Sequence, residues 1–275
     1  TIGMKKDFQT GALKAFNFSK LLQRVPELKL LDCEIETISF DNPIDSSNMN
    51  PENWVQIATI IEDNYESFDG FVVLHGSDTM SYSASALSFM LENLSKPVIF
   101  TGSQLPIGDL RTDAKENLIT AIQIASLREK GKPVISEVCL YFEYKLYRGN
   151  RTTKINAEHF NAFGSPNYPF LIESGVHLKV NLELRLPVKS NINLKVHKDF
   201  DTNVVIVKMF PGISKTVLSA IIAIPNLKGI VLETYGAGNA PTEDWFLDLL
   251  GEAVKKGLPI VNVTQCSGGS VHMGQ

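Results

Sequence analysis

Short apolar runs alternate with amphipathic segments along this chain, and this alternation constrains the fold more than any other feature of the sequence. Residues 70–74, 97–100 and 137–142 are rich in valine, isoleucine, leucine and phenylalanine, as expected for strands buried on both faces. Between these runs, residues 80–94 and 113–125 carry apolar side chains at intervals of three and four, which predicts helices. Strand–helix–strand order of this kind predicts a parallel sheet covered by helices on both faces.

A change in the pattern divides the chain into domains. Between residues 187 and 202 the alternation gives way to a polar stretch with a proline, as expected for a linker. The alternation then resumes, with strands expected at 204–207, 229–232 and 258–263 and helices at 214–222 and 241–254. We therefore expect an α/β protein with a larger N-terminal domain (1–186), whose mostly parallel sheet lies between helices, and a smaller C-terminal α/β domain (203–275). Three strands and two helices make a thin module, so the second domain is expected to be incomplete.

The charge balance argues against partners that bind over a broad charged surface. The chain has 30 acidic and 26 basic residues and a net charge of −4, which provides no general field for nucleic acid or anionic lipid. Its uninterrupted apolar stretches are all too short to span a membrane. We therefore expect neither a nucleic-acid nor a membrane partner, and ligands must bind at local sites.

Metals and cofactors are not expected either. Cys33, Cys139 and Cys266 form no CxxC pair and are expected to be small buried side chains in a reducing compartment. The histidines form no His-x-x-x-His pair of the kind that binds zinc. Residues 236–241 begin like a dinucleotide-binding loop, but proline replaces the third glycine, so we interpret them as a tight turn.

Polar residues follow directly on the first buried run. The segment His75-Gly76-Ser77-Asp78-Thr79 lies between that run and the helix expected from Met80 onward. In open α/β sheets, ligands bind beyond the carboxyl ends of the strands, where a helix N-terminus favours an anion. Simple capping of the helix by Ser77 or Asp78 explains the same residues equally well.

Three other segments are candidates for function, and each also has a simpler explanation. Asp45-Ser46-Ser47-Asn48 lies between strand-like residues 35–40 and a helix that Asn50-Pro51 begins, and it suits either a bound carboxylate or a turn. Residues 148–154 are dense in hydrogen-bond donors, as many surface loops are. A first residue Thr1 suggests an N-terminal nucleophile hydrolase, but the antiparallel sandwich of those enzymes does not fit the alternating pattern.

Taken together, these segments resemble the signatures of the bacterial-type L-asparaginases. Thr1-Ile2-Gly3 is similar to the end of that family's Thr-Gly-Gly-Thr-Ile-Gly motif. Residues 70–80 resemble its second signature, with Ser77-Asp78 in place of the usual Thr-Asp pair. Residues 45–49 resemble the loop that binds the substrate carboxylate, and residues 147–154 the segment that carries the catalytic lysine. The segments similar to the type I, cytoplasmic branch are residues 85–94, 235–241 and 262–266.

The resemblance implies an amidohydrolase that converts L-asparagine to L-aspartate and ammonia without a metal or cofactor. Thr1 would be the nucleophile that forms an acyl-enzyme, and Ser77, Asp78 and Lys154 would activate Thr1 or the hydrolytic water. Ser46 and Ser47 would bind the α-carboxylate of the substrate, and Asp78 its α-ammonium group. The residues implied in substrate binding are Asp45, Ser46, Ser47, Ser77, Asp78 and Ser103, the last through its backbone.

The same resemblance implies a cytoplasmic homodimer or homotetramer in which the neighbouring subunit closes each site. Alternatives remain: a glutaminase-asparaginase, the ammonia-releasing subunit of a tRNA amidotransferase, or a non-catalytic module that binds an amino acid. One electrostatic question also stays open, because Asp78 beside Lys154 favours the charged lysine whereas burial favours the neutral amine.

Overall fold

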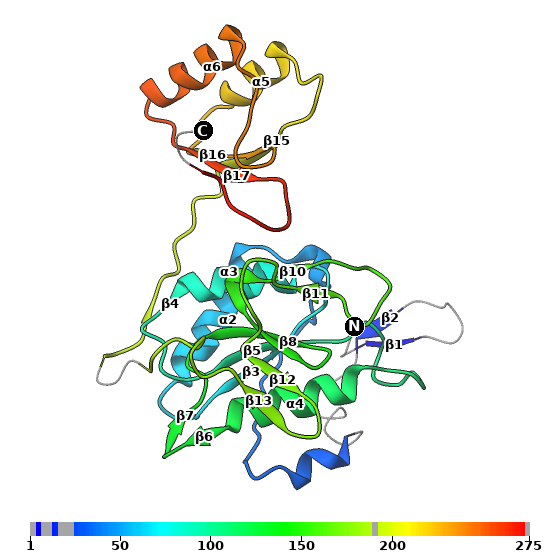
Figure 1. Ribbon diagram of the computed structural model, residues 1–275. Helices are drawn as coiled ribbons and strands as arrows, with labels where there is room; N and C mark the ends of the chain where they lie inside the picture. Colours follow the sequence, from blue (N-terminus) through cyan, green and yellow to red (C-terminus); the bar gives the residue numbers. More distant parts are fainter. Residues whose placement is uncertain (1–3, 7–12, 16–24, 189–191, 273–275) are drawn as a thin grey trace. The chain divides into compact units, whose positions relative to one another are not determined.

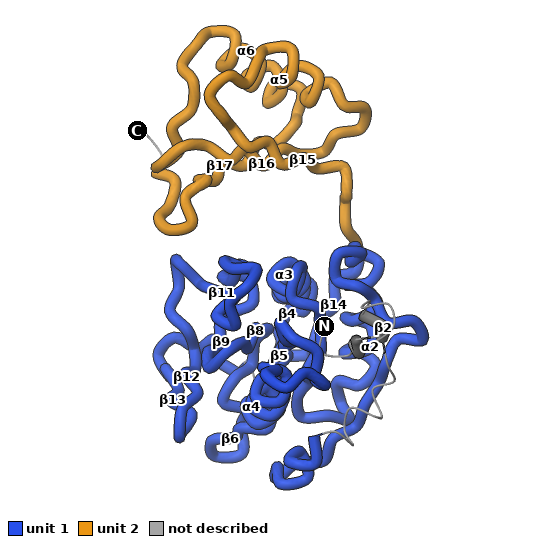
Figure 2. Tube along the Cα trace, turned by 90° about the vertical axis from the view of Figure 1, so that its right-hand side faces the viewer, with its two compact units in different colours: residues 1–198 blue, residues 199–275 orange. Residues whose placement is uncertain are grey.

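The structure, a computed structural model, describes residues 4–6, 13–15, 25–188 and 192–272. The chain divides into two compact units, Thr1–Lys198 and Asp199–Gln275 (Figure 2). In the described residues, the first unit contains a six-stranded sheet and three α-helices, and the second a three-stranded sheet and two α-helices. The α/β class predicted from the alternating pattern is confirmed.

The large sheet is mixed, with strand order β13-β12-β9-β8-β5-β3. Its three parallel strands are β3 (Phe71–Leu74), β5 (Val98–Thr101) and β8 (Val138–Phe142). The antiparallel strands are β9 (Lys145–Arg148), β12 (Ile172–Ser174) and β13 (Leu178–Val180). The expected parallel sheet is therefore extended by an antiparallel half. The reason is the tight turn after β8, where Glu143 and Tyr144 adopt left-handed φ angles of 40° and 68° and reverse the chain into β9.

Helices cover both faces of this sheet (Figure 1). α2 (Pro51–Asp63) and α3 (Met80–Met90) pack on one face, and α4 (Ala114–Ser126) on the other. Successive residues of β8 alternate between the two cores: Leu140 packs with α2 and α3, whereas Cys139 and Tyr141 pack with α4. Because all five residues of β8 are buried, this strand is the centre of the N-terminal unit.

The first residues of α2 and α3 show which of the polar residues before them act as helix caps. At α2, Asn50 and Asn53 exchange side-chain-to-backbone hydrogen bonds in a capping box and Pro51 opens the helix, which confirms the predicted start. α3 starts after Thr79, and Ser77 and Asp78 lie outside the helix. The explanation of Ser77 or Asp78 as helix cap is therefore wrong, because the cap position belongs to Thr79. α3 also ends earlier than expected, at Met90, where the chain enters β4 (Leu91–Glu92).

The remaining elements of the first unit are short. The hairpin strands are β1 (Met4–Lys6), β2 (Leu13–Ala15), β6 (Arg128–Glu129), β7 (Lys132–Pro133), β10 (Thr153–Lys154) and β11 (Phe163–Gly164). β14 (Lys195–Val196) pairs with β4, and the 3-10 helices are η1 (Pro26–Leu30), η2 (Ser46–Asn48) and η3 (Gly149–Arg151). Residues 35–40 form no strand, contrary to expectation, because they are mostly exposed and no strand of the described residues pairs with them.

The second unit has a parallel sheet of β15 (Val204–Lys208), β16 (Gly229–Thr234) and β17 (Ile260–Thr264). Its helices are α5 (Lys215–Ile222) and α6 (Asp244–Lys255), which share a core with the sheet. Residues 236–241 form the expected turn, in which Tyr235 and Asn239 pair across it.

Of the three cysteines, only Cys139 is buried, so the expectation of three buried thiols is wrong for Cys33 and Cys266. No helix in the described part of either unit combines the length and hydropathy needed to cross a membrane.

A buried ion pair fixes the segment that leads from β9 toward β10. The guanidinium of Arg148 donates to both carboxylate oxygens of Glu137 and to the carbonyl of Leu184, at 2.8 Å for the last. Glu137 also accepts from the backbone N–H of Leu186 at 2.9 Å. Only 4% of the Glu137 side chain and 13% of the Arg148 side chain are exposed, so the two charges are satisfied mainly by each other and by the backbone.

We predict that Glu137→Gln destabilises the protein by about 3–5 kcal/mol, because the charge of Arg148 stays buried after its partner is neutralised. Chemical unfolding measures this loss directly. The matched control is Glu129→Gln, whose carboxylate is half exposed and lies 3.5 Å from Arg185; it should cost no more than about 1 kcal/mol. Equal effects of the two substitutions would contradict the prediction.

A buried histidine follows β3. The Nδ1 of His75 lies 2.7 Å from the carbonyl oxygen of Gly76, and its Nε2 lies 2.8 Å from Ser83 Oγ. Because a carbonyl only accepts, Nδ1 carries the proton, and the Ser83 hydroxyl donates to Nε2 while accepting from Trp54 Nε1 at 2.8 Å. Burial lowers the pKa of His75 below its usual value, so the ring stays neutral and the chain of bonds remains intact.

This network predicts a loss of stability in mild acid. The unfolded chain protonates His75 at its ordinary pKa of 6.5, whereas the folded protein binds that proton only at lower pH. The free energy of unfolding should therefore fall as the pH falls below about 6.5. His75→Gln should reduce this fall, measured by chemical unfolding between about pH 7 and pH 5, whereas the exposed His177→Gln should not. An unchanged pH dependence in His75→Gln would refute the assignment.

Candidate active site

The candidate site lies where the neighbouring strands β3 and β5 end at one edge of the large sheet (Figure 1). Chain segments meet here at unusually short range. A Cβ atom at Gly102, just after β5, would lie 2.2 Å from the carbonyl oxygen of His75, and a Cβ at Gly76 would lie 2.4 Å from Ser46 Oγ. At Gly102 the obstacle is backbone and at Gly76 it is the Ser46 side chain, so a larger residue at either position would push the segments beginning at Asp45, His75 and Gly102 apart; together these three segments form one continuous wall.

Three of the residues expected to act in catalysis meet at this wall. Lys154, in β10, donates to Ser77 Oγ at 2.9 Å and to Asp78 Oδ1 at 2.7 Å. Ser77 is buried, and the Lys154 side chain is 18% exposed, whereas the Asp78 side chain is 65% exposed. The cluster thus has a buried hydroxyl, a lysine that donates to it, and a carboxylate that faces solvent.

The loop expected to bind a substrate carboxylate lies against the same wall. Asp45 caps η2, and its carboxylate accepts from the backbone N–H of Ser47 at 3.0 Å and from the Ser47 hydroxyl at 2.8 Å. These bonds lower the pKa of the Asp45 carboxyl below its usual range. Ser46 is buried, and its carbonyl accepts from Thr79 Oγ1 at 2.6 Å. The loop is therefore a capped turn, and the Thr79 hydrogen bond holds it next to the segment that contains Ser77.

The other expected site residues are placed less directly. Ser103 is fully buried, and its hydroxyl donates to the carbonyl of Leu105 at 2.6 Å, so its hydroxyl is already engaged within the loop. Thr1 lies outside the described residues. The structure therefore brings together Ser77, Asp78 and Lys154, places Ser46 beside them, and keeps Ser103 within the adjoining loop.

Two residues that the sequence analysis did not select hold the site in place. Gln104 Oε1 accepts from the Ser77 hydroxyl at 3.0 Å. The carboxylate of Asp113 accepts from the backbone N–H groups of Gln104, at 2.9 Å and 3.1 Å, and of Leu105, at 3.1 Å. Asp113 occupies the cap position of α4 but makes no capping bond with its side chain. The available signal was position alone, since these polar residues follow β5 at the same sheet edge as the Ser77 segment.

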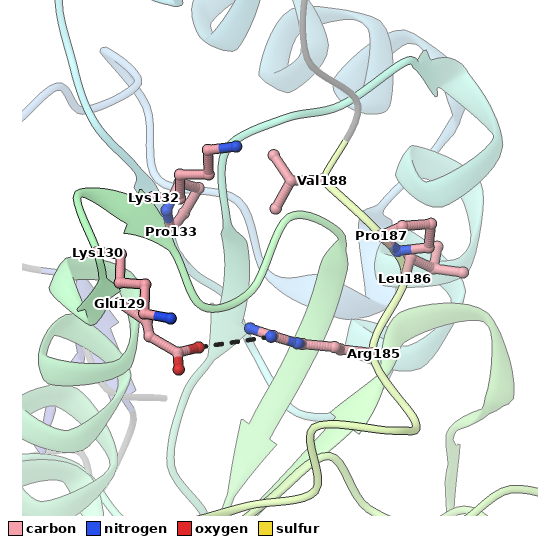
Figure 3. A pocket seen from close by; sticks show the side chains of 8 residues that line it. All are labelled: Glu129, Lys130, Lys132, Pro133, Arg185, Leu186, Pro187 and Val188. Carbon is pink, nitrogen blue, oxygen red and sulfur yellow. Dashed lines mark hydrogen bonds and ion pairs between the residues drawn. The ribbon is translucent and has the colours of Figure 1, made fainter.

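Two surface pockets contain none of these residues. One, of about 410 Å³, lies beside the β6–β7 hairpin, where Arg185 pairs with the carboxylate of Glu129 and where Lys130 and Lys132 also line the pocket (Figure 3). The other, of about 480 Å³, lies between α4 and the turn that joins β12 to β13. Within the described residues, no three histidine, cysteine, aspartate or glutamate side chains gather as metal ligands. The Ser77 cluster is therefore the arrangement best suited to chemistry, because it pairs a hydroxyl with a lysine and a carboxylate.

Comparison with known proteins extends this conclusion to the whole chain. The family model "Asparaginase, N-terminal" matches residues 1–186, and "Glutaminase/Asparaginase C-terminal domain" matches residues 203–275. L-asparaginase 1 of Escherichia coli (strain K12) is 44% identical over 275 residues, which cover 100% of this chain and 79% of that protein. The 60 kDa lysophospholipase of Mus musculus is 47% identical over 227 residues, which cover 82% of this chain and 39% of that protein.

Solved structures agree with the sequence comparison. The crystal structure of L-asparaginase I from Vibrio cholerae matches with a TM-score of 0.90 and 42% identity, covering 100% of this chain and 81% of that one. The resemblance to the type I branch is thereby confirmed. Because two family models follow each other along the chain and the fold matches throughout, the chain belongs to the asparaginase family.

Proposed function

We propose that this protein is an L-asparaginase, which hydrolyses the side-chain amide of L-asparagine to give L-aspartate and ammonia. The observation that carries the proposal is the contact of Lys154 with Ser77 and Asp78 at the carboxyl edge of the sheet, in a chain of the asparaginase family. An amide is a poor electrophile, and a hydroxyl positioned beside a lysine and a carboxylate supplies the proton transfers that its cleavage needs.

In the proposed reaction, the hydroxyl oxygen of Thr1 attacks the amide carbon and ammonia leaves, which gives a β-aspartyl ester. Water then attacks the ester, aspartate is released and the Thr1 hydroxyl is restored. Ser77, Asp78 and Lys154 move the protons in the two steps. The role of Thr1 rests on the family resemblance, and the roles of the other three are supported by their mutual contacts.

The α-groups of the substrate are proposed to bind on either side of Ser77. Ser46 is the better placed of the two serines for the α-carboxylate, because the hydroxyl of Ser47 already donates to Asp45. Asp78 is mostly exposed and anionic, which suits the α-ammonium group. Asp45 then acts mainly by shaping the loop, and Ser103 contributes its backbone to the side-chain amide.

The wider setting is proposed from the family. We propose a cytoplasmic homo-oligomer, dimer or tetramer, in which a neighbouring subunit completes each site. We also propose that residues 1–186 form the domain with the catalytic residues, 187–202 a linker and 203–275 the C-terminal domain, boundaries that agree with the spans of the two family models.

The proposed substrate is tested by ammonia release from L-asparagine, L-glutamine and D-asparagine, with the full-length protein at one pH. Glutamine is longer by one methylene, so its amide misses the attack position when its α-groups stay anchored, and such a misplacement near 1 Å costs about 10²-fold. We expect kcat/KM for L-asparagine to exceed that for L-glutamine by at least about 10²-fold. A ratio near one would favour a glutaminase-asparaginase or the ammonia-releasing subunit of an amidotransferase.

Ser77 provides a second test. Ser77→Ala should lower kcat by about 10²-fold or more, because it removes a hydroxyl that Lys154 contacts. Ser77→Thr, which restores the residue usual in the family, should retain activity. Ser126→Ala removes a serine hydroxyl at the end of α4 and serves as the control. A wild-type kcat in Ser77→Ala would exclude Ser77 from the catalytic set.

A further inference from the structure

The side chain of Gln104 connects the Ser77 cluster to residues 157–159, which follow Lys154 in the chain. Its Nε2 donates to the carbonyl of His159 at 3.0 Å and to that of Ala157 at 3.3 Å, while its Oε1 accepts from Ser77 at 3.0 Å. Carbonyl oxygens only accept, so the two carbonyls determine which end of the amide carries the nitrogen. The oxygen must therefore face Ser77.

This orientation also determines where the proton of Ser77 lies. Because Gln104 Oε1 has no proton to give, the Ser77 hydroxyl donates to it. Lys154 then donates to the oxygen of the same hydroxyl. The hydroxyl is thus held between a fixed acceptor and a donor, with its proton turned away from the lysine.

Gln104 is itself held by its backbone. Its N–H donates to the Asp113 carboxylate, and the Asn117 side chain donates both to that carboxylate, at 3.2 Å, and to the carbonyl of Gly102, at 3.0 Å. Gln104 is therefore held at two points: its backbone N–H is bound to Asp113 at the start of α4, and its side-chain amide is bound to residues 157–159.

From this geometry we infer that Gln104 is a positioning residue of the proposed asparaginase reaction, which acts by fixing the rotation of the Ser77 hydroxyl. The inference rests on the proposed function. Without the Gln104 acceptor, the hydroxyl can turn its proton toward Asp78 or water, and its alignment with Lys154 is lost. Gln104 contacts neither of the groups proposed to bind the α-carboxylate and α-ammonium, so the effect belongs to kcat rather than to KM.

The experiment is a double-mutant cycle in steady-state kinetics of the full-length protein with L-asparagine. Gln104→Met, which keeps the shape but removes both ends of the amide, should lower kcat by at least about 10-fold and change KM by less than about 3-fold. In the Ser77→Ala background the same substitution should lower kcat by less than about 2-fold, because the hydroxyl it acts on is gone. Gln104→Asn, which is too short to reach both Ser77 and the carbonyls, should resemble Gln104→Met. Gln123→Met, on the exposed side of α4, is the matched control and should leave kcat unchanged.

The outcomes separate this inference from the proposed function. An active wild type with unchanged kcat in both Gln104 variants would overturn the inference alone. Equal losses of kcat from Gln104→Met with and without Ser77 would also overturn it, because they would show a general structural effect. Absence of asparagine hydrolysis by the wild type would overturn the proposed function and the inference with it.

Discussion

The site depends on chain segments that approach too closely to leave room for a Cβ atom at Gly102 or Gly76. A Cβ atom at Gly102 would lie 2.2 Å from the His75 carbonyl oxygen, and one at Gly76 would lie 2.4 Å from the Ser46 hydroxyl. Hydrogen bonds extend over about 3 Å, so a backbone displaced by even about 1 Å to make room for a methyl group would separate their partners. The parallel pairing of β3 and β5 brings the strand ends to one edge, and the two glycines then let the following loops touch.

The chain is fixed both before and after Lys154, by different interactions. On the side that precedes it, the buried Arg148–Glu137 pair anchors the chain, and the Thr152 hydroxyl donates back to the Arg148 carbonyl at 2.8 Å. On the side that follows it, the Gln104 amide is attached to two backbone carbonyls. The ammonium group therefore meets Ser77 because both flanks of a short strand are fixed, and its own ion pair with the exposed Asp78 contributes little to that placement.

The sequence predicted what depends on local pattern. Periodicity located β3, β5 and β8, and Asn50-Pro51 predicted the start of α2, because apolar spacing and capping act over a few residues. The antiparallel half of the sheet was not predicted, because its strands are short and partly polar and the turn after β8 carries no glycine. Gln104 was missed because its partners are distant in the sequence, and no local pattern predicts a contact between residues 77 and 104.

The beginning of α4 shows how local rules give way to the site. Asp113 stands where a capping aspartate belongs, yet its carboxylate accepts from Gln104 and Leu105 instead. Thr112 replaces it: its hydroxyl accepts from the backbone N–H of Ala114 at 3.0 Å and donates to the carbonyl of Leu105 at 3.1 Å. A side-chain cap is worth about 1 kcal/mol, and here a neighbouring hydroxyl supplies part of that stabilisation while the charged group is released for the loop. The helix therefore begins stably, and at the same time its Asp113 holds Gln104, the residue that contacts Ser77.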